Sequence, residues 1–205
     1  MEFEELRIHV GNELKRRFWE HKAMPALSRG RARMDGWLKI ELAAILSEKF
    51  ADAQPAWKLP KGRAAARAGG WIVEAASLPT DFACDDTKPG PGSLADDVRD
   101  LRRTIKRLRK GRGPDRAAVF LAVYPFGDLH EARWAPHKSR IEKALGGPLS
   151  EDRFSFQSGV AGRLCAGVVA DKVKTQPTGR VETPGKAERT ARRPAGRAPR
   201  AAVVG

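Results

Sequence analysis

The chain has 205 residues, of which 41% are hydrophobic and 31% are charged, and this composition excludes a chain that is disordered throughout. Its length suits one domain of ordinary size with an extension. The formal net charge of +14 at pH 7 favours a polyanionic partner, above all nucleic acid.

Half of that charge lies at the C-terminal end. Residues 172–205 hold nine Lys and Arg residues but only two Glu residues, an excess of seven. The stretch is rich in Pro, Gly, Arg and Thr and shows no hydrophobic periodicity. Residues 171–205 are therefore predicted to form a disordered basic tail, and residues 1–170 a single domain.

The cysteines and the N-terminus bear on the cellular setting. Cys84 and Cys165 lie far apart and lack CxxC spacing, so neither a structural zinc site nor a disulfide framework is expected. This cysteine usage favours a reducing compartment. The N-terminus "MEFEELRIHV" is too charged for a signal peptide, and no apolar run approaches the roughly 20 residues of a membrane span. We expect a soluble, cytoplasmic protein with no membrane partner. The sequence does not indicate its oligomeric state.

The first 50 residues predict two helices. Apolar residues recur at helical spacing over residues 2–20 and over residues 35–50, where Asp35 is the expected N-cap. The stretch between them, 25–33, is rich in Arg and Gly and contains Pro25, which favours a loop. The apolar face of the second helix consists of Leu38, Leu42, Ile45 and Leu46.

The middle of the chain predicts a strand and then a helix. Residues 55–62 read as extended and 62–70 as a connection, followed by a strand at "WIVEAASL" (71–78) and a loop over 83–92. Ser93 is expected to cap the next helix, with Asp96 as its capping-box partner. One apolar stripe defines that helix: Leu94, Val98, Leu101, Ile105 and Leu108.

The last part of the predicted domain completes an α/β pattern. "RAAVFLAVYPF" (116–126) is apolar nearly throughout, as in a strand buried on both faces. A helix is expected over 136–145, because Pro136 should break any helix before it. Glycine-interrupted apolar residues over 154–173 predict one or two final strands. The order of these elements predicts an α/β domain with a central sheet.

Two carboxylates interrupt the predicted apolar faces. Glu41 lies between Trp37 and Ile45 on the helix face expected to pack on the sheet, and Glu74 shares a strand face with Ile72. A carboxylate facing a core must be paired, hydrogen-bonded or bound to a cation. Both acids could converge on Mg²⁺, which prefers oxygen ligands. The alternative is that each reaches solvent or an arginine at the boundary of the core.

The order "WLKIELAAIL", "WIVEAASLPTDF", "SLADDVRDLRRTIKRL" and "AAVFLAVYPF", over roughly residues 35–146, resembles nucleases of the PD-(D/E)XK or restriction-endonuclease-like superfamily. It looks most like uncharacterised bacterial members in which an E-x-K strand leads into a PT-(N/D)-(Y/F) segment. The resemblance implies an αβββαβ core with a central mixed sheet and flanking helices. It also implies a magnesium site that activates water for phosphodiester hydrolysis, with Glu41 and Glu74 as catalytic and metal-binding residues.

Two departures from the family pattern limit the expected activity. Ala76 stands where the E-x-K lysine would be, and no acid lies between Asp52 and Glu74 to serve as the strand aspartate. Each positioned donor or base typically contributes about 10²–10⁴ in rate. Lys58 or Lys61 from a neighbouring strand is a possible replacement. The resemblance thus implies a degenerate magnesium-dependent endonuclease with weak or absent hydrolysis.

The helix after Ser93 carries the predicted nucleic-acid contact. Past Asp100 the sequence "LRRTIKRLRKGR" contains no acid, and such like charges repel unless an anion or solvent screens them. No aromatic residues alternate with the basic ones, so binding is expected to be non-specific and driven by the phosphate backbone. The candidate contact residues are Arg99, Arg102, Arg103, Lys106, Arg107, Arg109 and Lys110.

These patterns leave three functions open. The first is a nucleic-acid-associated protein that resembles a metal-dependent nuclease with an incomplete site. The second is a non-enzymatic DNA- or RNA-binding protein that uses the basic helix and the tail. The third is an interaction module whose basic surface docks an acidic protein. "HEARWAPH" lacks the HExxH spacing of a metal site, and the glycine-containing segments match no nucleotide-binding motif.

Overall fold

The computed structural model describes residues 1–83 and 93–171. The helical elements are α1 (Phe3–Glu20), α2 (Met24–Arg29), α3 (Asp35–Lys49), α4 (Leu94–Gly111), the 3₁₀ turn η1 (Asp128–His130) and α5 (Glu131–Leu145). The strands are β1 (Gln54–Pro55), β2 (Ala66–Ala68), β3 (Trp71–Pro79), β4 (Arg116–Tyr124), β5 (Ser150–Ser155) and β6 (Ala161–Val168).

The strands form a mixed six-stranded sheet with the order β1-β2-β3-β4-β6-β5. β3 and β4 are parallel and are joined through α4, whereas the other neighbouring pairs are antiparallel. Every residue of β4 after Arg116 is buried, as expected for a central strand. The predicted α/β class with a central sheet is confirmed, and the sheet is mixed as expected.

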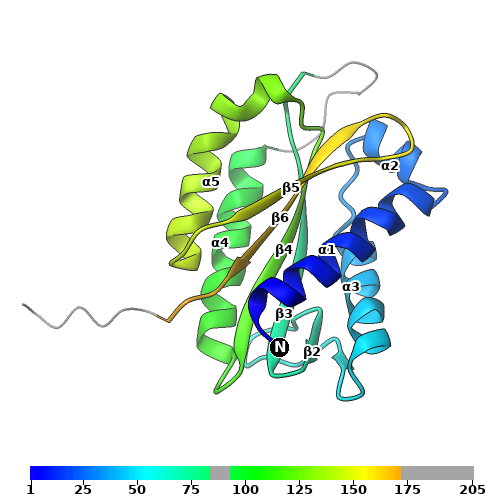
Figure 1. Cartoon of the computed structure of the whole chain (residues 1–205). Helices are drawn as coiled ribbons and strands as arrows, with labels where there is room; N and C mark the ends of the chain where they lie inside the picture. Colours follow the sequence, from blue (N-terminus) through cyan, green and yellow to red (C-terminus); the bar gives the residue numbers. More distant parts are fainter. Residues whose placement is uncertain (84–92, 172–205) are drawn as a thin grey trace, which may run out of the picture. The chain divides into compact units, whose positions relative to one another are not determined.

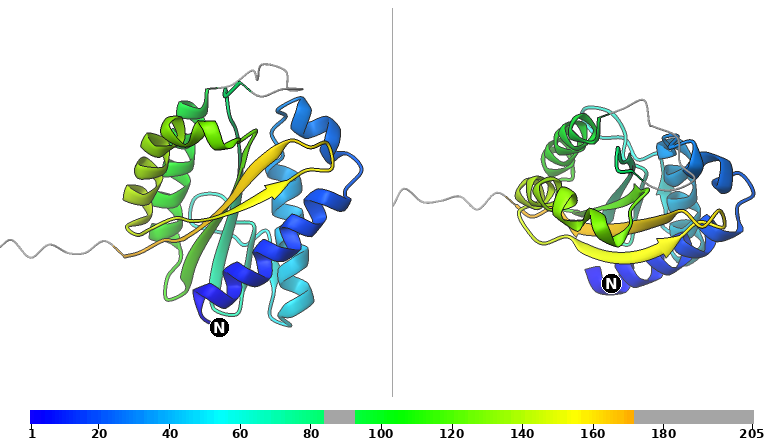
Figure 2. Two further views of the ribbon diagram at one scale, coloured as in Figure 1. Left: turned by 45° about the horizontal axis from the view of Figure 1, so that its top comes forward. Right: turned by 90° about the horizontal axis from the view of Figure 1, so that it is seen from above.

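Helices cover both faces of the sheet (Figures 1 and 2). Trp71 and Val73 of β3 pack in a core with residues of α1, α2 and α3. Ile72 and Leu78 belong to a second core built with α4 and α5. Successive strand side chains point to opposite faces, so β3 contributes to both cores. The alternation predicted for β3 is confirmed.

The predicted apolar stripe of α4 is also confirmed, since its members are all buried: Leu94, Val98, Leu101, Ile105 and Leu108. The helix begins after Ser93, as expected. The Ser93 side chain makes no capping hydrogen bond, however, so the predicted capping box with Asp96 is wrong.

Some local predictions need correction. Residues 24–29 form α2 instead of a loop, because Pro25 lies in its first turn, where a helix tolerates a missing N–H. Residues 66–68 form β2 within the expected connection. The last helix, α5, begins at Glu131 and continues through Pro136, because buried Trp134 and Ile141 hold the segment against the core on both sides of the proline.

Met1–Lys172 forms one compact unit. The predicted tail lies outside the described residues except for Asp171, and so does the predicted loop except for Ala83. No helix in the described part of the chain is long and apolar enough to cross a membrane.

Candidate functional site

The edge of β3 is open over most of its length. β2 pairs with residues 71–73 only, whereas β3 continues to Pro79. Beside this open edge, between α3 and α4, lies a pocket of about 130 Å³ that we call the edge pocket. It is lined by Arg33, Asp35, Lys39, Glu74, Ala75, Ala76, Ser77, Leu78, Asp97, Asp100, Leu101 and Thr104.

Glu74 is the buried acid of the edge pocket, with 1% of its side chain exposed. Its Oε1 accepts a hydrogen bond from the Ala75 N–H at 3.0 Å and lies 3.0 Å from the Lys39 Nζ. Its Oε2 lies 3.8 Å from the Arg107 Nη2 and accepts no hydrogen bond from the described residues. Burial raises the pKa of the Glu74 carboxyl, and the positive charge of Lys39 is the largest opposing influence.

Lys39 is the site residue that sequence reasoning missed. It lies on α3 and reaches Glu74 beside the part of β3 that β2 leaves uncovered. Lys39 and Glu41 are two positions apart, or about 200° around the helix axis, so their side chains point in different directions. The sequence offered one indication of this residue, a lysine two positions before Glu41 on the same helix. That indication points to Glu74 only once the position of α3 against β3 is known.

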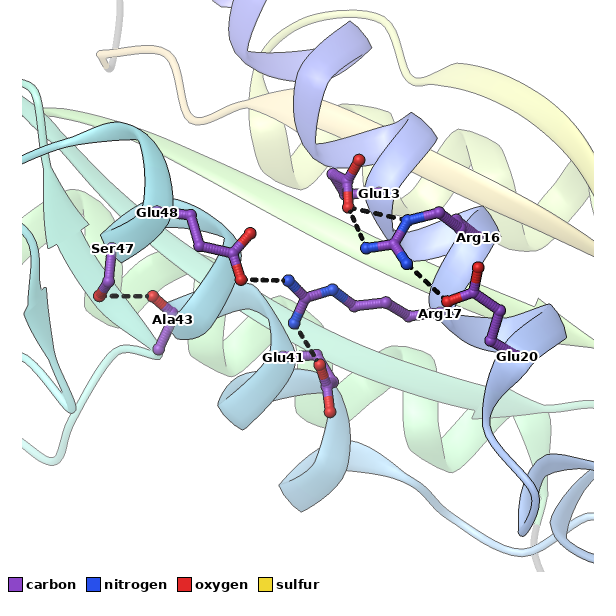
Figure 3. Close-up of polar contacts among 8 residues, drawn as sticks. All are labelled: Glu13, Arg16, Arg17, Glu20, Glu41, Ala43, Ser47 and Glu48. Atoms are coloured by element: carbon purple, nitrogen blue, oxygen red, sulfur yellow. Dashed lines mark hydrogen bonds and ion pairs between the residues drawn. The ribbon is translucent and has the colours of Figure 1, made fainter.

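Glu41 lies between α3 and α1 and does not line the edge pocket. Its Oε2 accepts a hydrogen bond from the Arg17 Nη1 at 2.5 Å, and Arg17 also donates to the Glu48 Oε1 at 2.7 Å (Figure 3). The expectation that Glu41 faces the sheet is wrong, because α1 packs on this side of α3 and brings Phe18 against Trp37. The structure therefore does not bring the two predicted acids together.

Along the open edge of β3, carboxylates take the place of a neighbouring strand as acceptors for the backbone N–H groups. The Ser77 N–H donates to the Asp35 Oδ1 at 2.5 Å, as the Ala75 N–H does to Glu74. Asp35 is thus the first residue of α3 and binds β3, instead of acting as the predicted N-cap. Buried N–H groups need such partners, so both acids have a clear role in stabilising the fold. Asp97 forms an ion pair with Arg33, and burial raises its pKa.

The edge pocket does not fit the magnesium site that the resemblance implies. Over residues 1–83 and 93–171, no group of three or more His, Cys, Asp or Glu is arranged to hold a metal ion. Glu41 is paired with Arg17. The ammonium of Lys39 lies beside Glu74, and its positive charge would repel a metal cation there. The described residues therefore give no support to a Mg²⁺ ion shared by Glu41 and Glu74, and that assignment stays a prediction.

A second depression, of about 580 Å³, lies between the C-terminal half of α4 and the loop 58–63. The loop is closed by a hydrogen bond from the Leu59 N–H to the Gly62 oxygen at 2.9 Å. We call this depression the basic groove, because it is lined by Lys61, Arg103, Lys106, Arg107, Arg109 and Lys110, with Pro60 and Gly111. No carboxylate is among these lining residues.

The structure divides the seven predicted nucleic-acid contacts. Four of them line the basic groove, and of these Arg103 also forms an exposed ion pair with Asp100: Arg103, Lys106, Arg107 and Lys110. Arg109 also lines the groove, but its guanidinium donates to carbonyls of the last turn of α5 and to the Ala170 oxygen. Arg99 forms an exposed ion pair with Asp96, and Arg102 does not line the groove.

Two glycines allow the walls of the basic groove to approach each other. Gly62 has φ +93°, and a Cβ there would lie 3.0 Å from the Arg107 Nη1. A Cβ on Gly111 would lie 2.8 Å from the Pro60 Cδ. Substitution at either position therefore requires a neighbour to move. Arg107 belongs to both sites, since it lines the groove and also contacts Glu74.

Neither a scan against protein-family models nor searches of curated proteins and of solved structures finds a match for this chain.

Proposed function

We propose that this chain is a cytoplasmic nucleic-acid-associated protein with a nuclease-like fold and weak or absent hydrolytic activity. The observation that carries the proposal is the Glu74–Lys39 pair. Glu74 lies on the central strand β3, Lys39 reaches it from α3, and the pair is next to α4, whose C-terminal half is basic. A carboxylate and an ammonium group then lie next to a surface suited to phosphates.

The order of elements supports a restriction-endonuclease-like core. The segment α3-β1-β2-β3-α4-β4 follows the αβββαβ order, with an antiparallel β1-β2-β3 unit and a parallel β3-β4 pair joined through α4. Glu74 lies on β3, the strand on which the resemblance puts the E-x-K glutamate. Ala76 lines the same pocket as Glu74.

Lys39 supports residual chemistry at Glu74. Its ammonium supplies, from a helix, the positive charge that Ala76 does not supply from the strand. A raised carboxyl pKa brings Glu74 closer to the range in which a group accepts a proton from water, and a nearby cation stabilises negative charge on a phosphate. A magnesium ion bound by both predicted acids would require Glu41 to leave Arg17. For that reason we expect low activity.

A combined gel-shift and plasmid-nicking assay tests the proposal, with Mg²⁺, Mn²⁺ or EDTA present. We expect DNA or RNA binding in EDTA that weakens as salt rises. Any cutting should disappear in Glu74→Gln and persist in Glu41→Gln, the matched control. Ala76→Lys should increase cutting, because the new amine enters the edge pocket.

Two results would overturn this proposal. The first is binding that competing DNA or RNA does not reduce, which would favour an acidic protein partner. The second is strong magnesium-dependent cutting that both Glu74→Gln and Glu41→Gln abolish, which would establish a complete two-carboxylate metal site.

A further inference from the structure

The basic groove gathers positive charge that the described residues neutralise only in part, since Arg103 pairs with the exposed Asp100 and Arg107 lies 3.8 Å from Glu74. Lys61, Lys106 and Lys110 form no ion pair within residues 1–83 and 93–171. The buried Nε of Arg107 has no hydrogen-bond partner there. Buried donors without acceptors cost free energy, and a concave surface of one sign concentrates counter-ions. The groove therefore favours an anion with several acceptor oxygens.

We propose that the basic groove is a binding site for two or three adjacent phosphoryl groups. Arg103, Arg107 and Lys110 follow one side of α4, and the rise from Arg103 to Lys110 is about 10 Å. Successive phosphates of one nucleic-acid strand advance about 3.4 Å along a duplex axis, so this length matches a short run of them. Lys61 closes the site from the loop 58–63. The tip of that loop was not recognised as part of the site from the sequence, since it lies far from α4 along the chain.

The phosphoryl groups can come from a nucleic-acid strand or from a free oligophosphate. Only the first source rests on the proposed function. The phosphate site in the groove depends only on the residues that line it and requires no catalytic role for Glu74.

Arg107 couples the basic groove to the edge pocket. Its Nη2 lies 3.8 Å from the Glu74 Oε2, which is too long for a hydrogen bond. A phosphate in the groove offers charge-assisted bonds of about 2.7–2.9 Å, and the fork of an arginine can make two of them. The guanidinium packs against Gly62, where a Cβ would lie only 3.0 Å from its Nη1, so the absence of a side chain at Gly62 is what gives Arg107 its place between the two sites. A bound phosphate would draw Arg107 away from Glu74 and leave Lys39 as the main counter-charge of that acid.

The test measures binding of sodium tripolyphosphate and of a fluorescent 12-nucleotide DNA strand by the full chain. The groove variant is Lys61→Ala/Lys106→Ala, whose two positions are exposed. The matched control is Lys22→Ala/Lys143→Ala, which removes the same charge from exposed positions outside the groove. We expect the groove variant to weaken tripolyphosphate binding at least tenfold, or about 1.4 kcal/mol. The control should change it less than twofold.

The outcomes separate this inference from the proposed function. Equal loss in the groove variant and in the control would overturn the groove site, because only total charge would then matter. Tripolyphosphate binding that depends on the groove, without DNA or RNA binding, would support the groove and overturn the nucleic-acid proposal. If the groove variant leaves both tripolyphosphate binding and nucleic-acid binding intact, the groove is overturned and the proposed function is kept. If tripolyphosphate displaces the DNA strand from wild type, both sources share the site.

Discussion

Lys39→Met tests whether the ammonium of Lys39 keeps Glu74 charged. Methionine retains an unbranched stem and removes the charge. Loss of one partner costs about 3–5 kcal/mol for a buried ion pair, and an exposed pair contributes about 0–1 kcal/mol. Glu74 is 1% exposed and Lys39 is 40% exposed, so this pair lies between the two cases. We expect a loss of about 2 kcal/mol at pH 7, or about 4–8 °C in Tm for a domain of this size.

The effect of Lys39→Met should depend on pH through Glu74. Because burial raises the pKa of Glu74 in the folded state, this group stabilises the fold below its ordinary pKa of 4.5. That contribution is lost as pH rises through the folded-state pKa. Removal of Lys39 raises this pKa further, so the destabilisation should be largest well above both values and should shrink as pH falls towards 4.5.

Urea denaturation from pH 5 to pH 8 measures this effect in wild type, Lys39→Met, Glu74→Gln and the double variant. Glutamine keeps a side-chain oxygen that can accept the Ala75 N–H. Lys39→Met should cost less than about 0.5 kcal/mol in the Glu74→Gln background, because the charge that it stabilises is gone. A loss of about 2 kcal/mol in both backgrounds would refute the reasoning, since Lys39 would then act through packing alone.

Other predictions concern the basic groove and the core. Gly62→Ala and Gly113→Ala both force a non-glycine residue into a positive-φ conformation, and each should cost about 1 kcal/mol in urea denaturation. Only Gly62→Ala should also weaken tripolyphosphate binding severalfold, because its Cβ would press on Arg107 whereas open space surrounds Gly113. Equal affinities would show that Arg107 does not act in the groove. Arg17→Met breaks ion pairs with both of its glutamate partners on α3 and should lower stability by about 1 kcal/mol without changing DNA affinity in a gel shift. Burial raises the pKa of the Cys165 thiol, so in a Cys84→Ser background it should react with a thiol reagent at pH 8 about a hundredfold slower than in urea; rapid labelling of the native chain would contradict its burial.

The parts of the fold that follow local patterns could be predicted from the sequence. A period of two along β3 assigned Trp71 and Val73 to one face and Ile72 to the other, and the structure confirms this. A helical period likewise assigned Leu101 and Ile105 of α4 to the core. These signals are reliable because each side chain's direction is set by its own backbone.

The wrong or missing parts depend on contacts between distant segments. The helical period placed Glu41 on a partly apolar side of α3, but it could not show that α1, and not the sheet, covers that side. Lys39 reaches Glu74 only because β2 is short, and the small side chains of Ala66 and Ala68 give little strand signal. The contribution of Lys61 to the basic groove likewise depends on how a loop packs against α4.

The open edge of β3 has a consequence for how copies of the chain meet. An extended segment of another molecule adds to a sheet by taking up free N–H and C=O groups along its edge. At this edge the N–H groups of Ala75 and Ser77 already donate to the carboxylates of Glu74 and Asp35. An incoming strand would have to displace both carboxylates, so the protein can keep a pocket open beside its central strands without offering a template for self-association.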